Sequence, residues 1–90
     1  MITLYTGDLC AYCTRAKMLL NEWDIPFKEK NITHNVEALE FLKLNGHRSV
    51  PQIYRNGKLL VEGGYDGLRA LGKQQLNERL GNIDVGDFKL

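Results

Sequence analysis

The chain alternates between short β-forming runs and longer segments in which apolar residues recur with helical spacing. Residues 2–6 predict a short strand, with Ile2 and Leu4 on the same face. Between residues 11 and 23 the apolar positions follow the i, i+4, i+7, i+8 pattern of an amphipathic helix. The residues of this apolar stripe are Tyr12, Ala16, Leu19, Leu20 and Trp23. Residues 27–31 predict a second strand.

A second helix and a hairpin follow. The pattern predicts a helix over about residues 35–45, ended by Gly46, because glycine accepts the left-handed backbone of a helix end. Residues 50–61 contain two apolar runs separated by Asn56 and Gly57. This pair favours a tight hairpin turn, since both central positions of a type I′ turn need positive φ. Two antiparallel strands, 50–55 and 58–61, are therefore expected.

A third helical segment is expected to begin near Tyr65 or Asp66. Gly72 lies inside it and allows two interpretations: one helix with a weak position, or two helices of which the second covers residues 73–80. A glycine inside a helix costs only about 1 kcal/mol relative to alanine, so the sequence does not decide between them. Residues 82–90 carry no pattern that predicts an element.

The expected order of elements is β-α-β-α-β-β-α. The first β-α-β unit should be parallel with a right-handed connection, and the later hairpin should be antiparallel. The natural packing is a four-stranded mixed sheet flanked by helices, which is an α/β architecture with the topology of the thioredoxin fold. We expect a single domain over residues 1–90, because a chain of this length supports one core.

Composition excludes several classes of function. The net charge is +1 and the 12 Lys and Arg residues form no run, so the chain has no field that would attract nucleic acid. No segment approaches the about 18 consecutive apolar residues that span a membrane. The N-terminus has no basic, apolar export signal, and we therefore expect a cytoplasmic protein with neither nucleic acid nor membrane as a partner.

Cys10 and Cys13 are the only cysteines, and they carry the candidate chemistry. A disulfide between them would close almost no loop, so a structural role is disfavoured. Cys10 is expected where a strand gives way to a helix, and the free N–H groups there stabilise a thiolate and lower the pKa of the Cys10 thiol. Cys13, one turn later, should be more enclosed. The pattern indicates Cys10 as nucleophile and Cys13 as resolving thiol.

Other uses of the cysteine pair are less consistent with the sequence. A zinc site needs four ligands, and His34 and His47 do not have ligand spacing to the cysteines, so no metal is expected. Thr14 stands where c-type haem attachment needs histidine. Two inert core cysteines stay possible, although the start of a helix is an unusual place for them.

Three segments together resemble the dithiol glutaredoxins: residues 5–17 around the cysteines, residues 46–54 around a Val-Pro pair, and residues 63–66. The resemblance extends over about residues 1–71. It implies an enzyme, a glutathione-dependent thiol–disulfide oxidoreductase that reduces protein disulfides and glutathione mixed disulfides. Glutathione would be the cosubstrate, the protein would be a monomer, and ribonucleotide reductase would be a plausible client.

The resemblance also implies roles for individual residues. In the family the proline matching Pro51 is cis and faces the cysteines, the backbone of the residue matching Val50 pairs with glutathione, and groups matching Tyr65 and Asp66 bind its γ-glutamyl end. Pro51 could instead be an ordinary proline at the start of a strand, Asp66 only a helix cap, and Tyr12 only packed surface. The implied glutathione-binding residues are Tyr12, His47, Arg48, Val50, Pro51, Gly64, Tyr65 and Asp66.

Several positions depart from the family pattern. Ala11 replaces the usual proline between the cysteines, and Gly7 replaces a lysine that often contacts glutathione. His47 replaces an arginine, with Arg48 beside it as a substitute, and Gly67 replaces a second acidic residue. The redox potential and the affinity for glutathione are therefore the parts of the resemblance that transfer least directly.

Three rival functions remain open at this level. The chain could be a thioredoxin-like reductant that is recharged by a flavoprotein reductase, although residues 63–66 favour glutathione. It could be an iron–sulfur carrier in which Cys10 and glutathione hold a cluster across a dimer, although Tyr12 and the second cysteine disfavour this. It could also be a binding module that uses the fold without redox chemistry.

Overall fold

The computed structural model describes residues 1–81, and residues 82–90 lie outside the described residues. The predicted order of elements, β-α-β-α-β-β-α, is confirmed. The elements are β1 (Ile2–Thr6), α1 (Ala11–Glu22), β2 (Phe27–Asn31), α2 (Val36–Leu44), β3 (Gln52–Arg55), β4 (Lys58–Val61) and α3 (Gly64–Arg79). No helix within residues 1–81 has both the length and the apolar character needed to cross a membrane.

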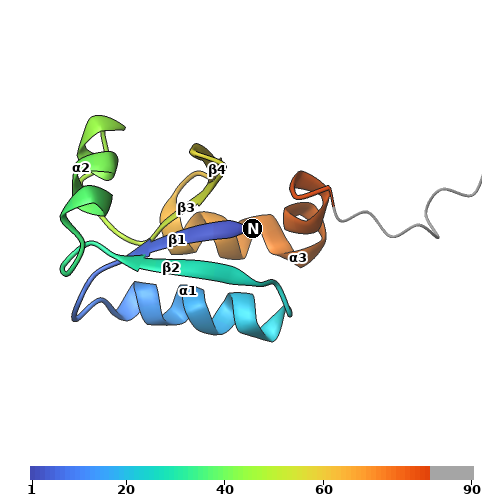
Figure 1. Ribbon diagram of the computed structural model, residues 1–90. Coiled ribbons are helices and arrows are strands. Elements are labelled where there is room, and N and C mark those ends of the chain that lie inside the picture. The colour runs from blue at the N-terminus through green and yellow to red at the C-terminus, as the bar shows by residue number, and fades with distance from the viewer. Residues whose placement is uncertain (82–90) are drawn as a thin grey trace, which may run out of the picture.

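The four strands form one mixed sheet in the order β2-β1-β3-β4. Strand β1 pairs in parallel with β2 and antiparallel with β3, and β3 pairs antiparallel with β4. The helices cover both faces of this sheet (Figure 1), so the expected thioredoxin fold is confirmed. The loops after β1 and before β3 meet at one end of the sheet because these two central strands are neighbours running in opposite directions.

The two faces of the sheet carry different cores. Helices α1 and α3 cover an aliphatic core in which Leu4, Leu20 and Leu68 are fully buried. Helix α2 covers a smaller aromatic core, where Tyr5 stacks on Phe41 with ring centroids 5.4 Å apart. Alternation of side chains along β1 explains the division, since successive residues of a strand point to opposite faces.

Local signals start and end the elements near the positions that the sequence predicts. The Asn35 side chain caps α2 by accepting a hydrogen bond from the Ala38 backbone N–H at 3.0 Å. Gly46 follows the helix with φ of 80°, as expected for its stop. Asn56 and Gly57 both have positive φ, 53° and 77°, so the hairpin turn has the backbone that the sequence predicts.

Gly72 interrupts α3 without ending it. Its φ of 84° and ψ of 162° are non-helical, and they divide α3 into two helical parts joined by a kink. Leu68 before the kink and Leu76 after it are both fully buried in the aliphatic core. The kink thus allows both parts to face the same core. The spacing of apolar residues alone could not decide between one helix and two. Gly81, with φ of 77°, follows the second part.

The predicted strand over residues 50–55 was too long at its start. Strand β3 begins at Gln52, and Val50 and Pro51 precede it as a separate turn with a cis peptide bond between them. The cis isomer agrees with the family resemblance. These two residues do not pair with β1, so their backbone groups are not used in the sheet. They belong to the loop that faces the cysteines.

Candidate active site

Cys10 occupies the N-cap of α1. Its backbone is extended, and its Sγ accepts a hydrogen bond from the backbone N–H of Cys13 at 3.1 Å. This N–H is one of those that a helix start leaves without an intrahelical partner. The first turn of α1 contains no acidic residue, so nothing there opposes a negative charge on the sulfur. The position is the one that the sequence predicts for a reactive thiol.

Cys13 lies one turn further on and is buried. The two cysteines form a disulfide with their Cα atoms 5.2 Å apart, so the structure represents the oxidised form. Cys13 is 2% exposed, whereas Cys10 is only partly covered. The predicted apolar stripe placed Tyr12 on the buried face of the helix, and this was wrong: Tyr12 is 52% exposed. Cys13 takes the inward position because it lies on the same helix face as the buried Ala16 and Leu20.

The loop before β3 comes into contact with the cysteines. The Sγ of Cys10 lies 3.8 Å from the carbonyl oxygen of Val50, although the two residues are 40 positions apart in the sequence. Pro51 is buried directly beside Val50. The antiparallel pairing of β1 with β3 produces this contact, because it brings the end of β1 next to the start of β3.

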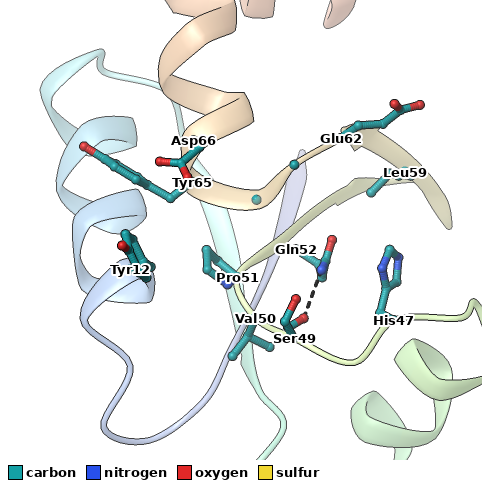
Figure 2. A pocket seen from close by; sticks show the side chains of 12 residues that line it. Tyr12, His47, Ser49, Val50, Pro51, Gln52, Leu59, Glu62, Tyr65 and Asp66 are labelled. Carbon is teal, nitrogen blue, oxygen red and sulfur yellow. Dashed lines mark hydrogen bonds between the residues drawn. The ribbon is translucent and has the colours of Figure 1, made fainter.

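A groove of about 470 Å³ runs across Val50 and Pro51. Figure 2 shows Tyr12 and Tyr65 at one end of the groove, with Pro51 facing them. The two tyrosine rings come from α1 and α3, and their centroids lie 6.0 Å apart. The guanidinium of Arg15 lies 5.3 Å from the centroid of the Tyr12 ring. Tyr12 is therefore part of a groove wall made by two helices.

The start of α3 forms the adjacent rim. Gly64 packs so closely on the loop before β3 that a Cβ there would lie 3.1 Å from the carbonyl oxygen of Pro51. Tyr65 and Asp66 follow in the first turn, where backbone N–H groups lack intrahelical partners. A Cβ on Gly67 would overlap the carbonyl oxygen of Glu62. This contact gives a physical reason for the glycine where the family has an acidic residue.

His47 and Arg48 are placed differently. His47 lines the groove, and its Nε2 lies 2.6 Å from the Tyr54 hydroxyl, so the aromatic core orients its ring. Arg48 is exposed and is not among the residues that line the groove. Of the predicted glutathione-binding residues, the groove brings together all except Arg48: Tyr12, His47, Val50, Pro51, Gly64, Tyr65 and Asp66.

A second, more polar hollow of about 520 Å³ lies on the other side of the disulfide and is lined by both cysteines. In it Glu29 accepts a hydrogen bond from the Thr6 hydroxyl at 2.7 Å and forms an ion pair with Lys17 at 3.2 Å. These contacts, the Thr6 hydrogen bond first, lower the pKa of the Glu29 carboxyl although partial burial opposes them.

Asp8 ties the loop before Cys10 to the turn after β2. Its carboxylate accepts a hydrogen bond from the Asn31 amide at 2.9 Å and lies 2.8 Å from the Nε2 of His34. The Asn31 hydrogen bond first, and then His34, lower the pKa of the Asp8 carboxyl against an opposing desolvation effect. The Asp8 backbone N–H also donates to the Thr33 hydroxyl at 3.0 Å. His34 is thus engaged in holding this loop.

Sequence reasoning did not identify five residues that line the groove: Ser49, Gln52, Leu59, Glu62 and Gly63. Only the hairpin signal around residues 56–57 could have suggested that β4 returns to this loop. Within residues 1–81, no group of three or more His, Cys, Asp or Glu side chains is arranged to hold a metal ion.

A helix-capping cysteine disulfide beside a cis-proline loop, on this sheet, defines a thiol–disulfide oxidoreductase of the thioredoxin fold. Comparison with known proteins gives the family: the glutaredoxin family model matches residues 2–60, and the chain belongs to that family. A glutaredoxin of Neisseria meningitidis serogroup A is 39% identical over 79 residues, covering 74% of this chain and 93% of the relative. Glutaredoxin 3 of Escherichia coli K12 is 38% identical over 71 residues, covering 78% and 83%.

Solved structures agree on the fold. The crystal structure of the buckwheat glutaredoxin–glutathione complex superposes with a TM-score of 0.72 at 21% identity, covering 90% of this chain and 76% of that one. The glutaredoxin-like protein NrdH-redoxin from Escherichia coli superposes with a TM-score of 0.66 at 23% identity, covering 86% and 91%.

Proposed function

We propose that this protein uses glutathione to reduce protein disulfides and glutathione mixed disulfides, with Cys10 as the nucleophile and Cys13 as the resolving thiol. The observation that carries the proposal is the placement of the Cys10 sulfur. It caps α1 and lies 3.8 Å from the Val50 carbonyl, at the edge of a groove whose volume suits a small peptide.

The groove offers groups that match glutathione. The free N–H groups of Tyr65 and Asp66 favour the γ-glutamyl carboxylate, because a helix start attracts an anion. We expect the backbone of Val50 to pair with the cysteinyl unit, which would bring the glutathione sulfur to Cys10; the 3.8 Å approach of the Cys10 sulfur to the Val50 carbonyl supports this. Pro51 and Tyr12 supply apolar walls. His47 and Arg48 are the proposed contacts for the glycyl carboxylate, with Arg48 reaching in from outside the groove.

The reaction with a glutathione mixed disulfide needs Cys10 alone. Its thiolate attacks the glutathione sulfur, the bond between the two substrate sulfurs breaks, and the client leaves as a thiolate that takes up a proton. A second glutathione thiolate then attacks the glutathione sulfur bound to Cys10. Oxidised glutathione leaves, and the Cys10 thiolate is restored.

Reduction of a protein disulfide needs both cysteines. Cys10 attacks one client sulfur and releases the other as a thiolate. Cys13, deprotonated, then attacks the Cys10 sulfur, releases the client as a dithiol, and leaves the Cys10–Cys13 disulfide. Two glutathione molecules reduce that disulfide again and leave as oxidised glutathione. Burial of Cys13 supports the division of roles, because a covered thiol meets the Cys10 sulfur more readily than it meets a client.

A coupled assay tests the proposal. The protein, glutathione, glutathione reductase and NADPH are mixed with a glutathione mixed disulfide, and NADPH consumption is followed by absorbance. Turnover that depends on both glutathione and this protein is expected. No turnover by a folded, reduced protein would contradict the glutathione-dependent function.

Likeness to NrdH-redoxin favours one second candidate, since that glutaredoxin-like protein has a thioredoxin-like activity profile. The glycines at positions 7 and 67 also remove side chains that the glutaredoxin pattern uses. In this alternative a thioredoxin reductase, and not glutathione, would reduce the Cys10–Cys13 disulfide. Replacing glutathione and its reductase by thioredoxin reductase in the same assay distinguishes the two.

Ribonucleotide reductase is the client that we propose from the family resemblance, with the chain acting as a cytoplasmic monomer of one domain. Deoxyribonucleotide formation by an oxidised ribonucleotide reductase, supplied with this protein and its reductant, tests the client. Formation no faster than with the reductant alone would reject it.

A further inference from the structure

The groove also contains residues that are not assigned to glutathione, and they lie at the same end as His47, which is. The far end of the groove, opposite Tyr12 in Figure 2, is lined by Gln52 of β3, Leu59 of β4 and Glu62 just after β4. None of these three residues has a role in the proposed contacts with glutathione. Their side chains nevertheless share one open space with Val50, where the client chain must lie when Cys10 attacks its disulfide.

Gln52 supplies a hydrogen-bond acceptor in a fixed orientation. Gln52 is 7% exposed as a residue, and its Nε2 donates to the carbonyl oxygen of Ser49 at 2.9 Å. Figure 2 shows the side-chain oxygen pointing away from Ser49. Within residues 1–81 no donor is bonded to this oxygen, and because it is not fully buried it is open to the groove. An acceptor held in this orientation at the groove is available to a donor from a ligand.

Leu59 and Glu62 supply the other two components of a binding site for a cation with an apolar stem. Leu59 is 38% exposed and offers an apolar surface within the groove. Glu62 is exposed, and the ion pairs within residues 1–81 are Lys17–Glu29 and His34–Asp8, so its carboxylate has no partner there. Arg79 borders a neighbouring hollow with Glu62 but donates to the Leu60 carbonyl oxygen at 2.8 Å.

We propose that this end of the groove binds a Lys or Arg side chain that lies close to the disulfide cysteine of the client protein. The aliphatic stem would pack on Leu59, and the cationic head would meet the Glu62 carboxylate and the Gln52 side-chain oxygen. The inference rests on the proposed function, since the client must first enter the groove to reach Cys10.

Charge distinguishes this occupant from glutathione. Glutathione carries two carboxylates and one ammonium group, and none of its side chains is a long cation. A carboxylate and an amide oxygen attract cationic donors and repel carboxylates, so this end of the groove is better matched to a basic client than to the tripeptide. Selection among clients is a difference in affinity, and an unpaired charge at the rim is a common way to create it.

A set of synthetic peptides tests the proposal. Each peptide contains one intramolecular disulfide. The two residues that flank the attacked cysteine are both Lys in one peptide, both Ala in the second and both Glu in the third. The wild-type protein, kept reduced by glutathione and glutathione reductase, should show kcat/KM about fivefold higher for the Lys peptide than for the Glu peptide, the upper range for an exposed ion pair. Glu62→Gln should bring this ratio close to one, and Glu62→Lys should invert it.

Glu40→Lys is the matched control. Glu40 is exposed on α2 and does not line the groove, so this variant makes the same change in net charge and should keep the Lys preference. Equal rates for the three peptides with the wild-type protein, or an unchanged Lys preference in Glu62→Lys, would overturn the proposal. Turnover of a glutathione mixed disulfide is measured in parallel to distinguish failure of this inference from failure of the proposed function. If the wild type does not turn over the mixed disulfide either, the proposed function itself is wrong.

Discussion

Two hollows flank the cysteine pair, and they differ in what their polar groups are doing. In the hollow toward β2, the carboxylates of Asp8 and Glu29 are already engaged by neighbouring side chains. The groove toward β3 is lined by Val50, by Gln52 and by the first turn of α3, whose backbone N–H groups lack intrahelical partners. The two spaces are similar in size, about 520 Å³ and 470 Å³.

The difference shows that polar content alone does not identify a binding site. Groups that satisfy each other hold the protein together, whereas groups fixed in place without a partner are available to a ligand. The polar hollow therefore serves to hold the loop before Cys10 against β2, and the groove is where a substrate would gain new interactions. Variants on the two sides should accordingly affect different properties.

The largest effect is expected at the sulfur that faces the groove. Cys10→Ser should lower turnover by about 10³-fold or more, because a hydroxyl at this position is not ionised and cannot form the mixed disulfide. The coupled NADPH assay measures the loss, and far-UV circular dichroism controls for folding. If this variant kept substantial activity on a protein disulfide, the groove would not be the site of attack.

Cys13→Ser should separate the two reactions. Protein-disulfide reduction should be lost, because no thiol remains to attack the Cys10 sulfur, whereas glutathione mixed-disulfide turnover should stay within about threefold of the wild type. The same preparation is assayed with both substrates, and mass spectrometry detects the trapped client–Cys10 adduct. An equal loss with both substrates would contradict the assigned roles.

Loss of a groove wall should have a smaller effect. Tyr65→Ala removes the ring that lies 6.0 Å from Tyr12 and should raise KM for a glutathione mixed disulfide about fivefold, as expected for one aromatic contact. Tyr65→Phe keeps the ring and should behave like the wild type. Because Tyr65 also packs on the aliphatic core, the stability of both variants is measured by urea unfolding. If the wild type and both variants had the same KM, Tyr65 would not be part of the binding site.

The smallest change in activity is expected in the polar hollow. Thr6→Val removes the main contact that lowers the pKa of Glu29, so that pKa should move up toward its usual value, as followed by NMR titration. Turnover should change by less than about twofold, since the hollow makes no proposed contact with substrate. Lys17→Ala, which removes the ion pair with Glu29, should also raise the pKa of the Glu29 carboxyl.

The sign of the pH effect follows from the direction of that shift. A carboxyl with a lowered pKa in the folded state contributes stability above its unfolded pKa and loses it as the pH falls through the folded value. The difference in unfolding free energy between wild type and Thr6→Val should therefore be larger at neutral pH than in acid. A difference independent of pH would mean that the Thr6 hydrogen bond does not favour ionised Glu29.

Much of the fold could be predicted from local patterns. Alternating residues in β1, the left-handed positions at Gly46 and Gly57, and the short spacing of Cys10 and Cys13 each depend on a few neighbouring residues. The errors arose where packing chose between local options. Tyr12 fits an apolar stripe by spacing, but the buried face of α1 is formed by Cys13, Ala16 and Leu20, and Tyr12 lies at the groove.

The sequence by itself determined the order of the elements and the position of Cys10 at a helix start, because hydrogen bonding within a few residues sets both. Only the tertiary structure decided that Val50 lies against that sulfur, that Tyr65 lies beside Tyr12, and that Gln52 and Glu62 line the same groove. Such contacts join residues that are tens of positions apart. They depend on strand order and helix packing, which are properties of the whole core and not of any one segment.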